Sequence, residues 1–365
     1  MNGPCVALAV SGTGGHLFPG LALAEEIRRR RPDARILFFS SGRPLETEVL
    51  GSLGFDRVDL PRIERPSGVR GAAALATGLP RAAIRASRAM KRERVRAFVG
   101  LGGGSTLIPA LAAWRRGIPV GLLEQNARPG WTTRMLSRLA AWVVTQWPDT
   151  ESAFPRPSRV HAAGNPLRNA ILEGVRADPA SLGLLPGRRT ILVLGGSQGA
   201  RGLNLMVEEA LPDLASCAGS LQFFHVSGGS DLERVRKAYG AAGLRAIVAA
   251  FRTDMASLYA ASDLVVTRAG GTTLAEIAFF GRPAILVPFP AAADDHQTEN
   301  ARRFAALGGA DVVTQAPGAG ARLATLVKEA LDDSDGLERR ARASRGFHRP
   351  DARARIADRI LAAVA

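Results

Sequence analysis

The chain has 365 residues, of which 46% are hydrophobic, and this length indicates two domains rather than one core. Its formal net charge of +15 predicts an anionic partner such as a nucleic acid, an acidic membrane surface or a phosphorylated substrate. Two cysteines, Cys5 and Cys217, exclude a disulfide framework and a cysteine metal site. No lysine or arginine precedes the first apolar run, so we expect no signal peptide and a cytoplasmic protein whose membrane contact is peripheral.

Short apolar runs alternate with amphipathic stretches through the first half of the chain. Strand-like runs lie at 6–10, 35–40, 97–101 and 118–123, and helical patterns lie at 19–30, starting near Pro19, and at 107–116. The uncharged stretch 97–114 carries glycines, hydroxyl groups and a proline in its middle, so we interpret it as a strand, a loop and a helix start rather than a membrane span. The alternation predicts β-α-β units around a parallel sheet.

A second series of strand-like runs begins at Thr190. Its runs lie at 190–196, 221–227, 246–251, 263–271 and 284–290, with helical patterns between them. Gly164, Asn165 and Pro166 interrupt the pattern between the two series, and the last fifteen residues form an amphipathic segment after Pro350. We therefore predict an α/β protein with two Rossmann-like, doubly wound domains, over 1–163 and 164–345, and a C-terminal helix over 346–365 that can pack back on the first domain.

Glycine-rich turns follow four of the predicted strands. They lie at 12–15, 100–104, 195–199 and 270–271. Such turns expose amide N–H groups at helix N-termini, which favours a phosphorylated ligand at the carboxyl ends of both sheets. The dinucleotide fingerprint is absent, because it would require glycine at Leu17, and no P-loop sequence is present.

The turn around Ser197 has a second interpretation. The sequence "GGSQG" matches the nucleophile elbow of a hydrolase, with Asp254 or Asp263 and then His296 following in the order of a catalytic triad. A hydrolase would leave the N-terminal glycine turns without a role. This alternative stays open at the level of the motif.

Several polar residues stand beside these turns. His16 is a candidate general base, and its alternative is a helix cap. Glu276 is a candidate ribose ligand behind the turn at Gly270, and its alternative is a capping box with Thr273. Gln297 is a candidate sugar partner. The neighbouring Asp294, Asp295 and His296 resemble metal ligands, but no further histidine or cysteine completes a site, so we expect no metal and no cofactor.

Basic residues recur every three or four positions near residue 90. They are Arg81, Arg85, Arg88, Arg92 and Arg96, and the spacing predicts that they line one helix face. Such a face suits an anionic membrane, and an equally good interpretation is a solvated surface. We expect no nucleic-acid partner, since the chain has only 5% aromatic residues and no nucleic-acid-binding motif.

Six motifs in order make the chain resemble the MurG family. They are "SGTGGHLFPGLALAEEI", "GLLEQN", "AGNPLR", "LGGSQGARGLN", "TRAGGTTLAEIAFFGRPAILVPFP" and "DDHQTENA", and they span nearly the whole chain. The resemblance implies a GT-B fold and an inverting transfer of N-acetylglucosamine from UDP-GlcNAc to the C4 hydroxyl of undecaprenyl-pyrophosphoryl-MurNAc-pentapeptide, in peptidoglycan synthesis. It implies a donor site in the C-terminal domain, an acceptor site in an N-terminal domain docked on the cytoplasmic face of the inner membrane, and partners among cell-wall synthesis proteins. A related GT-B enzyme with another lipid acceptor is the alternative.

The resemblance also implies roles for particular residues. It makes His16 the general base and Ser197 a phosphate-loop serine. The other implied substrate-binding residues are Thr13, Gly14 and Gly15 near the diphosphate and sugar, Asn126 at the sugar, Arg168 on the donor, Arg252 at the uracil through its backbone, Gly270, Gly271, Thr272 and Thr273 at the diphosphate, Glu276 at the ribose and Gln297 at the sugar. The sequence departs from the family pattern at Gly104, Leu123, Thr133 and Arg252.

Overall fold

The computed structural model describes residues 3–11, 14–61, 68–173, 179–195 and 200–364. Their contacts divide the chain into two units, one of Met1–Arg168 with Arg349–Ala365 and the other of Asn169–His348. The chain therefore passes into the second unit five residues beyond the predicted boundary and returns to the first unit after His348.

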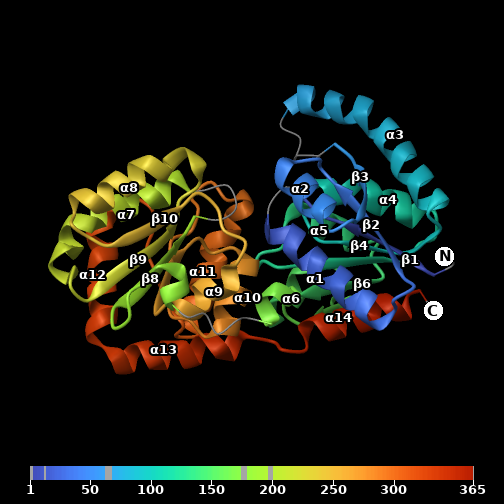
Figure 1. The fold of residues 1–365 in the computed structure, drawn as a ribbon. Coiled ribbons are helices and arrows are strands. Elements are labelled where there is room, and N and C mark those ends of the chain that lie inside the picture. The colour runs from blue at the N-terminus through green and yellow to red at the C-terminus, as the bar shows by residue number, and fades with distance from the viewer. Residues whose placement is uncertain (1–2, 12–13, 62–67, 174–178, 196–199, 365) are drawn as a thin grey trace. The chain divides into compact units, whose positions relative to one another are not determined.

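The first unit is built around a seven-stranded parallel sheet (Figure 1). Its strands are β1 (Cys5–Ala9), β2 (Arg35–Ser40), β3 (Asp56–Asp59), β4 (Val95–Gly100), β5 (Val120–Glu124), β6 (Trp142–Thr145) and β7 (Val160–Ala162), in the order β3-β2-β1-β4-β5-β6-β7. Its helices are α1 (Gly14–Arg30), α2 (Pro44–Ser52), α3 (Gly68–Arg92), α4 (Leu107–Arg115), α5 (Trp131–Leu136) and α14 (Ala352–Ala362).

Both faces of this sheet are buried, because alternate residues of each strand enter opposite layers. On one face Cys5, Ala7 and Ala9 pack with apolar residues of α3, α4 and α5. On the other face Val6 and Leu8 pack with apolar residues of α1, α2 and α14. Continuous apolar strands covered on both sides are what the sequence predicted for a doubly wound domain.

The second unit repeats this plan with a six-stranded parallel sheet (Figure 1). Its strands are β8 (Arg189–Leu194), β9 (Leu221–Val226), β10 (Ala246–Ala249), β11 (Leu264–Thr267), β12 (Ala284–Leu286) and β13 (Ala310–Val312), in the order β10-β9-β8-β11-β12-β13. Its helices are α6 (Asn169–Leu172), α7 (Arg201–Leu214), α8 (Leu232–Ala241), α9 (Met255–Ala261), α10 (Gly271–Phe280), α11 (His296–Ala306), α12 (Ala319–Asp332) and α13 (Ser334–Phe347). One face packs on α7, α8 and α12. The fold class predicted from the sequence is confirmed.

Two predicted local features are wrong. Helix α1 begins at Gly14 rather than near Pro19, and Pro19 lies inside it. A proline so close to the helix start forfeits only one backbone hydrogen bond, so the helix tolerates it. Arg96 does not share a helix face with the other arginines, because α3 ends at Arg92 and Arg96 lies in β4.

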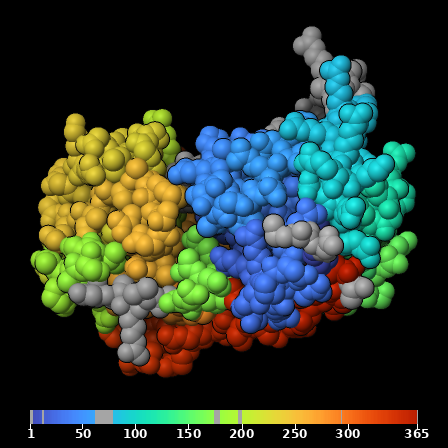
Figure 2. Space-filling model, turned by 45° about the vertical axis from the view of Figure 1, so that its right-hand side comes forward, coloured from blue at the N-terminus to red at the C-terminus, as the bar shows by residue number. Residues whose placement is uncertain are grey.

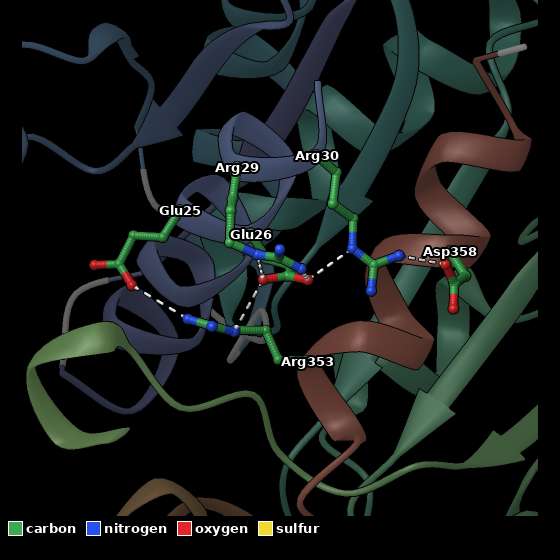
Figure 3. Close-up of polar contacts among 6 residues, drawn as sticks. All are labelled: Glu25, Glu26, Arg29, Arg30, Arg353 and Asp358. Carbon is green, nitrogen blue, oxygen red and sulfur yellow. Dashed lines mark hydrogen bonds and ion pairs between the residues drawn. The ribbon is translucent and has the colours of Figure 1, made fainter. Parts of the chain in front are cut away.

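Helix α14 is joined to the C-terminal half of α1 by charged side chains (Figure 3). Glu26 of α1 is only 1% exposed and accepts hydrogen bonds from Arg29 and Arg30, while Arg353 of α14 lies 3.4 Å from the same carboxylate. Arg30 also pairs with Asp358 of α14. The last helix is therefore held on α1 by ion pairs as well as by its apolar residues Ile356 and Ile360.

Candidate functional site

In each sheet one group of candidate residues lies at the point where the strand order reverses. The chain runs from β1 outward to β3 and returns on the other side of β1 as β4, and it does the same from β8 to β11. Ligands of open parallel sheets bind beyond the carboxyl ends of the strands at such a reversal. His16 follows β1, and the Gly270 turn follows β11.

His16 lies in the first turn of α1, half-buried above the ends of β1 and β4. Its Nδ1 atom is 3.1 Å from the backbone oxygen of Ser11. A carbonyl oxygen can only accept, so Nδ1 carries the proton, and in the neutral ring Nε2 is the basic nitrogen. The geometry fits a general base whose tautomer is set by the backbone.

The glycines after β4 leave room for this ring. A Cβ atom on Gly102 would lie 2.9 Å from Nε2 of His16, and one on Gly103 would overlap the side chain of Ser11. Both glycines also have positive φ angles, of 99° and 73°. Gln125, which follows β5, is buried beside them, and its Oε1 atom has no hydrogen-bond partner in the described residues. The predicted glycine-rich turn at 100–104 thus contacts the candidate base directly.

Asn126 is held by its neighbour Glu124. One oxygen of the buried Glu124 carboxylate accepts from both the backbone and the side-chain nitrogen of Asn126, at 3.0 and 3.1 Å. The other oxygen accepts from the backbone nitrogen of Gly130 at 3.0 Å, and Thr133 supplies a side-chain hydrogen bond. Burial raises the pKa of Glu124, and these hydrogen bonds oppose that rise. The arrangement fixes the side chain of a predicted sugar ligand.

Arg168 is the last residue of the first unit before the chain enters the second. Its guanidinium lies 4.1 Å from the ring centroid of Phe18 on α1, a cation–π contact. Its Nε atom is buried with no hydrogen-bond partner in the described residues. Gly14 and Gly15 lie in the same first turn of α1 as His16.

In the second unit, Gly270 is the N-cap of α10 and Gly271–Thr273 form its first turn. The helix therefore begins two residues before Thr273, and no side chain caps it. The capping box between Thr273 and Glu276 is wrong for this reason. Glu276 is buried in the second turn, where its Oε2 atom accepts a 2.9 Å hydrogen bond from the hydroxyl of Tyr259.

Arg252 lies on the loop after β10, and Gln297 lies in α11, which follows β12 in the chain. The guanidinium of Arg252 makes two hydrogen bonds to Asp254, at 2.7 and 2.5 Å, so its side chain is engaged within its own loop. Hydrogen bonding to Arg252 lowers the pKa of Asp254. Gln297, in the first turn of α11, accepts from the backbone nitrogen of Phe289 at 3.0 Å.

Two predicted site residues, Thr13 and Ser197, lie outside the described residues. Because Ser197 is not described, the triad alternative stays a prediction. The carboxylate of its candidate Asp263 accepts from the backbone nitrogen of Thr190 at 2.7 Å, at the amino-terminal end of β8. Among the described residues no three histidine, cysteine or acidic side chains gather into a metal site.

Two exposed apolar residues, one on α3 and one on α4, were not among the residues considered from the sequence. Arg81, Arg85, Arg88 and Arg92 are exposed, as predicted, and Ile84 of α3 and Trp114 of the adjacent α4 are each about half exposed. Figure 2 shows the described part of α3, in cyan, at the surface of its unit. In the described part of the chain no helix is both long and apolar enough to cross a membrane.

The chain was then compared with known proteins. Residues 6–145 match the glycosyltransferase family 28 N-terminal domain and residues 190–356 match its C-terminal domain. Curated relatives named UDP-N-acetylglucosamine--N-acetylmuramyl-(pentapeptide) pyrophosphoryl-undecaprenol N-acetylglucosamine transferase include one from Anaeromyxobacter sp. (strain K), 41% identical over 96% of this chain and 91% of that protein. Another, from Nitratidesulfovibrio vulgaris (strain Hildenborough), is 41% identical over 98% of this chain and 96% of that protein.

Solved structures resemble the chain as well. The crystal structure of Acinetobacter baumannii MurG is 30% identical, covers 98% of this chain and 99% of its own, and superposes with a TM-score of 0.77. The UDP-GlcNAc 2-epimerase of Neisseria meningitidis, solved with UDP-GlcNAc, is 16% identical, with a TM-score of 0.70 over 98% of this chain and 100% of its own, and shares the fold alone.

Proposed function

Because the chain belongs to glycosyltransferase family 28, among its MurG members, we propose that the residues at the two strand-order reversals carry out the reaction of that group. The chain is a UDP-GlcNAc-dependent N-acetylglucosaminyltransferase with a GT-B fold. It transfers N-acetylglucosamine to lipid I, undecaprenyl-pyrophosphoryl-MurNAc-pentapeptide, and so makes lipid II for peptidoglycan.

In the proposed mechanism His16 is the general base. Its Nδ1 atom donates to the backbone oxygen of Ser11, so Nε2 is the basic nitrogen that would take the proton of the acceptor's C4 hydroxyl. The C4 oxygen bonds to the anomeric carbon as the bond from that carbon to the UDP oxygen breaks, with inversion at the carbon. The orientation of His16 at the end of β1 is the observation that carries the assignment.

The departing UDP gains negative charge, which residues of the second unit would stabilise. We propose that the turn Gly270–Thr273 binds the diphosphate, since amides of a helix start and the helix dipole favour an anion there. Glu276 would accept from the ribose hydroxyls, Gln297 would bind the sugar, and Arg252 would meet the uracil through its backbone. We assign Thr13 and Ser197 to the diphosphate, and Gly14, Gly15, Asn126 and Arg168 to the donor and its sugar.

The membrane role belongs to the same proposal. Helix α3 carries four exposed arginines and the half-exposed Ile84, and α4, which packs on α3, carries the half-exposed Trp114. Anionic lipids attract such a basic surface, and a tryptophan side chain is favoured at the lipid–water boundary. We propose that the protein binds peripherally to the cytoplasmic face of the inner membrane, where lipid I resides and where other cell-wall synthesis proteins would be its partners.

The test of the proposed function is UDP release from UDP-GlcNAc with and without a lipid-linked muramyl-pentapeptide. Release that depends on the acceptor supports the transferase. Release that is equal with and without the acceptor indicates a hydrolase of the donor and contradicts it.

A further inference from the structure

Arg268 has a buried charge without a carboxylate partner in the described residues. It follows β11 directly, two residues before Gly270, and its side chain is only 8% exposed. Its NH1 atom donates to the backbone oxygens of Val287 and Pro288, at 3.0 and 3.1 Å, and its NH2 atom donates to Oε1 of Gln315 at 2.6 Å. All three acceptors are neutral. Burial lowers the pKa of this guanidinium to about 10.

These three hydrogen bonds tie together three segments at one edge of the sheet. Val287 and Pro288 follow β12, and Gln315 follows β13. The amide of Gln315 lies where a Cβ atom on Gly202 would be, in the first turn of α7. Arg268 thus links the chain after β11, β12 and β13, and its partner Gln315 packs against the first turn of α7.

The same contacts reach the candidate sugar ligand. Phe289, the residue after Pro288, donates its backbone nitrogen to Gln297, and its ring centroid lies 5.5 Å from the guanidinium carbon of Arg268. Loss of Arg268 would therefore release the segment that orients Gln297. A buried cation that has only neutral partners is costly in the free protein and favours an anion arriving nearby.

We propose that Arg268 is a positioning residue of the donor site, which holds three loops at the sheet edge and leaves its positive field for the diphosphate of a uridine nucleotide. This inference rests on the proposed function, because it assigns the anion as the donor's diphosphate. It goes beyond that function, because it predicts that the loss of binding affinity without Arg268 grows with the number of phosphates on the ligand.

The experiment compares binding of uridine, UMP and UDP to wild type, Arg268→Met, Arg268→Lys and Arg282→Met by calorimetry. Arg282 is the matched control, since it is a half-buried arginine of the same unit. In the described part of the chain it donates to the carbonyl of Ala260, and Asp263 lies nearby as a counter-charge. We expect Arg268→Met to lower the affinity for UDP about tenfold or more and the affinity for UMP by less. Its affinity for uridine should stay within twofold of wild type. Arg282→Met should bind UDP with an affinity within twofold of wild type.

Two results would overturn the inference. The first is that Arg268→Met loses as much affinity for uridine as for UDP. The second is that Arg282→Met loses as much affinity for UDP as Arg268→Met does. If Arg268→Met does not fold, Arg268→Lys decides, because it keeps the charge and loses the planar fork. It should bind UDP less tightly than wild type and uridine equally well, and unchanged UDP binding would overturn the inference. A wild-type protein that binds none of the three ligands would contradict the proposed function itself.

Discussion

Glu124 accepts hydrogen bonds from both nitrogens of Asn126, at 3.0 Å from the backbone and 3.1 Å from the side-chain amide. This pair fixes the direction of the Asn126 amide at the carboxyl end of β5. Thr133, one of the departures from the family pattern, supports the pair through its own hydrogen bond to Glu124. The sequence therefore departs from the family pattern at Thr133, a residue that hydrogen-bonds to the Glu124 carboxylate.

We predict that Glu124→Gln lowers kcat/KM about tenfold, because the new amide has one acceptor oxygen and leaves either Asn126 or Gly130 unsatisfied. If Glu124 acts through Asn126, the double variant Glu124→Gln/Asn126→Ala loses no more activity than Asn126→Ala alone. Steady-state kinetics of the four proteins measures this. Losses that multiply would show that Glu124 has a separate role.

Glu276→Gln should weaken uridine and UDP equally, by about tenfold, since the ribose is common to both and a charged acceptor is lost. Tyr259→Phe, which removes the hydrogen bond to Glu276, should cause a smaller loss for both ligands. Calorimetric titration of the two ligands provides the measurement. A loss confined to UDP would place Glu276 at the diphosphate rather than the ribose.

Acid should weaken the attachment of α14 to α1. Hydrogen bonds from Arg29 and Arg30 lower the pKa of Glu26 to about 2 from a usual value of 4.5. A lowered folded-state pKa contributes stability that is present above pH 4.5 and is lost as the pH falls toward 2. We expect Glu26→Gln to remove about 2 kcal/mol of unfolding free energy at pH 7 and to flatten its decline over that range.

Denaturant unfolding of the first unit at several pH values tests this expectation. Glu25→Gln is the matched control, since Glu25 neighbours Glu26 and lies 3.7 Å from Arg353 but is more exposed. The unfolding free energy of Glu25→Gln should stay within about 0.5 kcal/mol of the wild-type value. An equal effect of the two substitutions would contradict the role given to the buried carboxylate.

Membrane binding should depend on the surface of α3. The triple variant Arg81→Glu/Arg85→Glu/Arg88→Glu should reduce binding to vesicles containing anionic phosphatidylglycerol about a hundredfold or more, at roughly 1 kcal/mol for each basic residue. Trp114→Ser should weaken binding further. Leu205→Ser is the control, since Leu205 is an exposed apolar residue on α7 in the other unit. Sedimentation with vesicles that is unchanged in the triple variant would contradict this docking surface.

The sequence predicts most of the strands that are buried on both sides, and it misses β3, β6, β7 and β13. Runs such as Val6–Leu8 and Ile191–Leu194 are continuous and apolar because helices cover both faces of the sheet. By contrast, β3 and β13 have four and three residues, and each has exposed positions. They exist through pairing with β2 and β12, which no local pattern records.

The site divides in the same way. His16 and the Gly270 turn follow predicted strands, so their positions at the strand-order reversals could be inferred from the chain. The role of Arg268 could not be inferred, because its acceptors lie 19, 20 and 47 residues away and meet it only in the folded sheet. The engagement of Arg252 with Asp254, two residues along, was open to prediction from their charges but was not expected.

The central claim is that His16 takes the proton of the acceptor hydroxyl. The most direct measurement is acceptor-dependent UDP release under single turnover by wild type, His16→Ala and the control His161→Ala, a half-buried histidine on β7. The account predicts that His16→Ala loses about a hundredfold or more in rate while UDP-GlcNAc affinity is kept, and that His161→Ala keeps both. A near wild-type rate in His16→Ala would contradict the account.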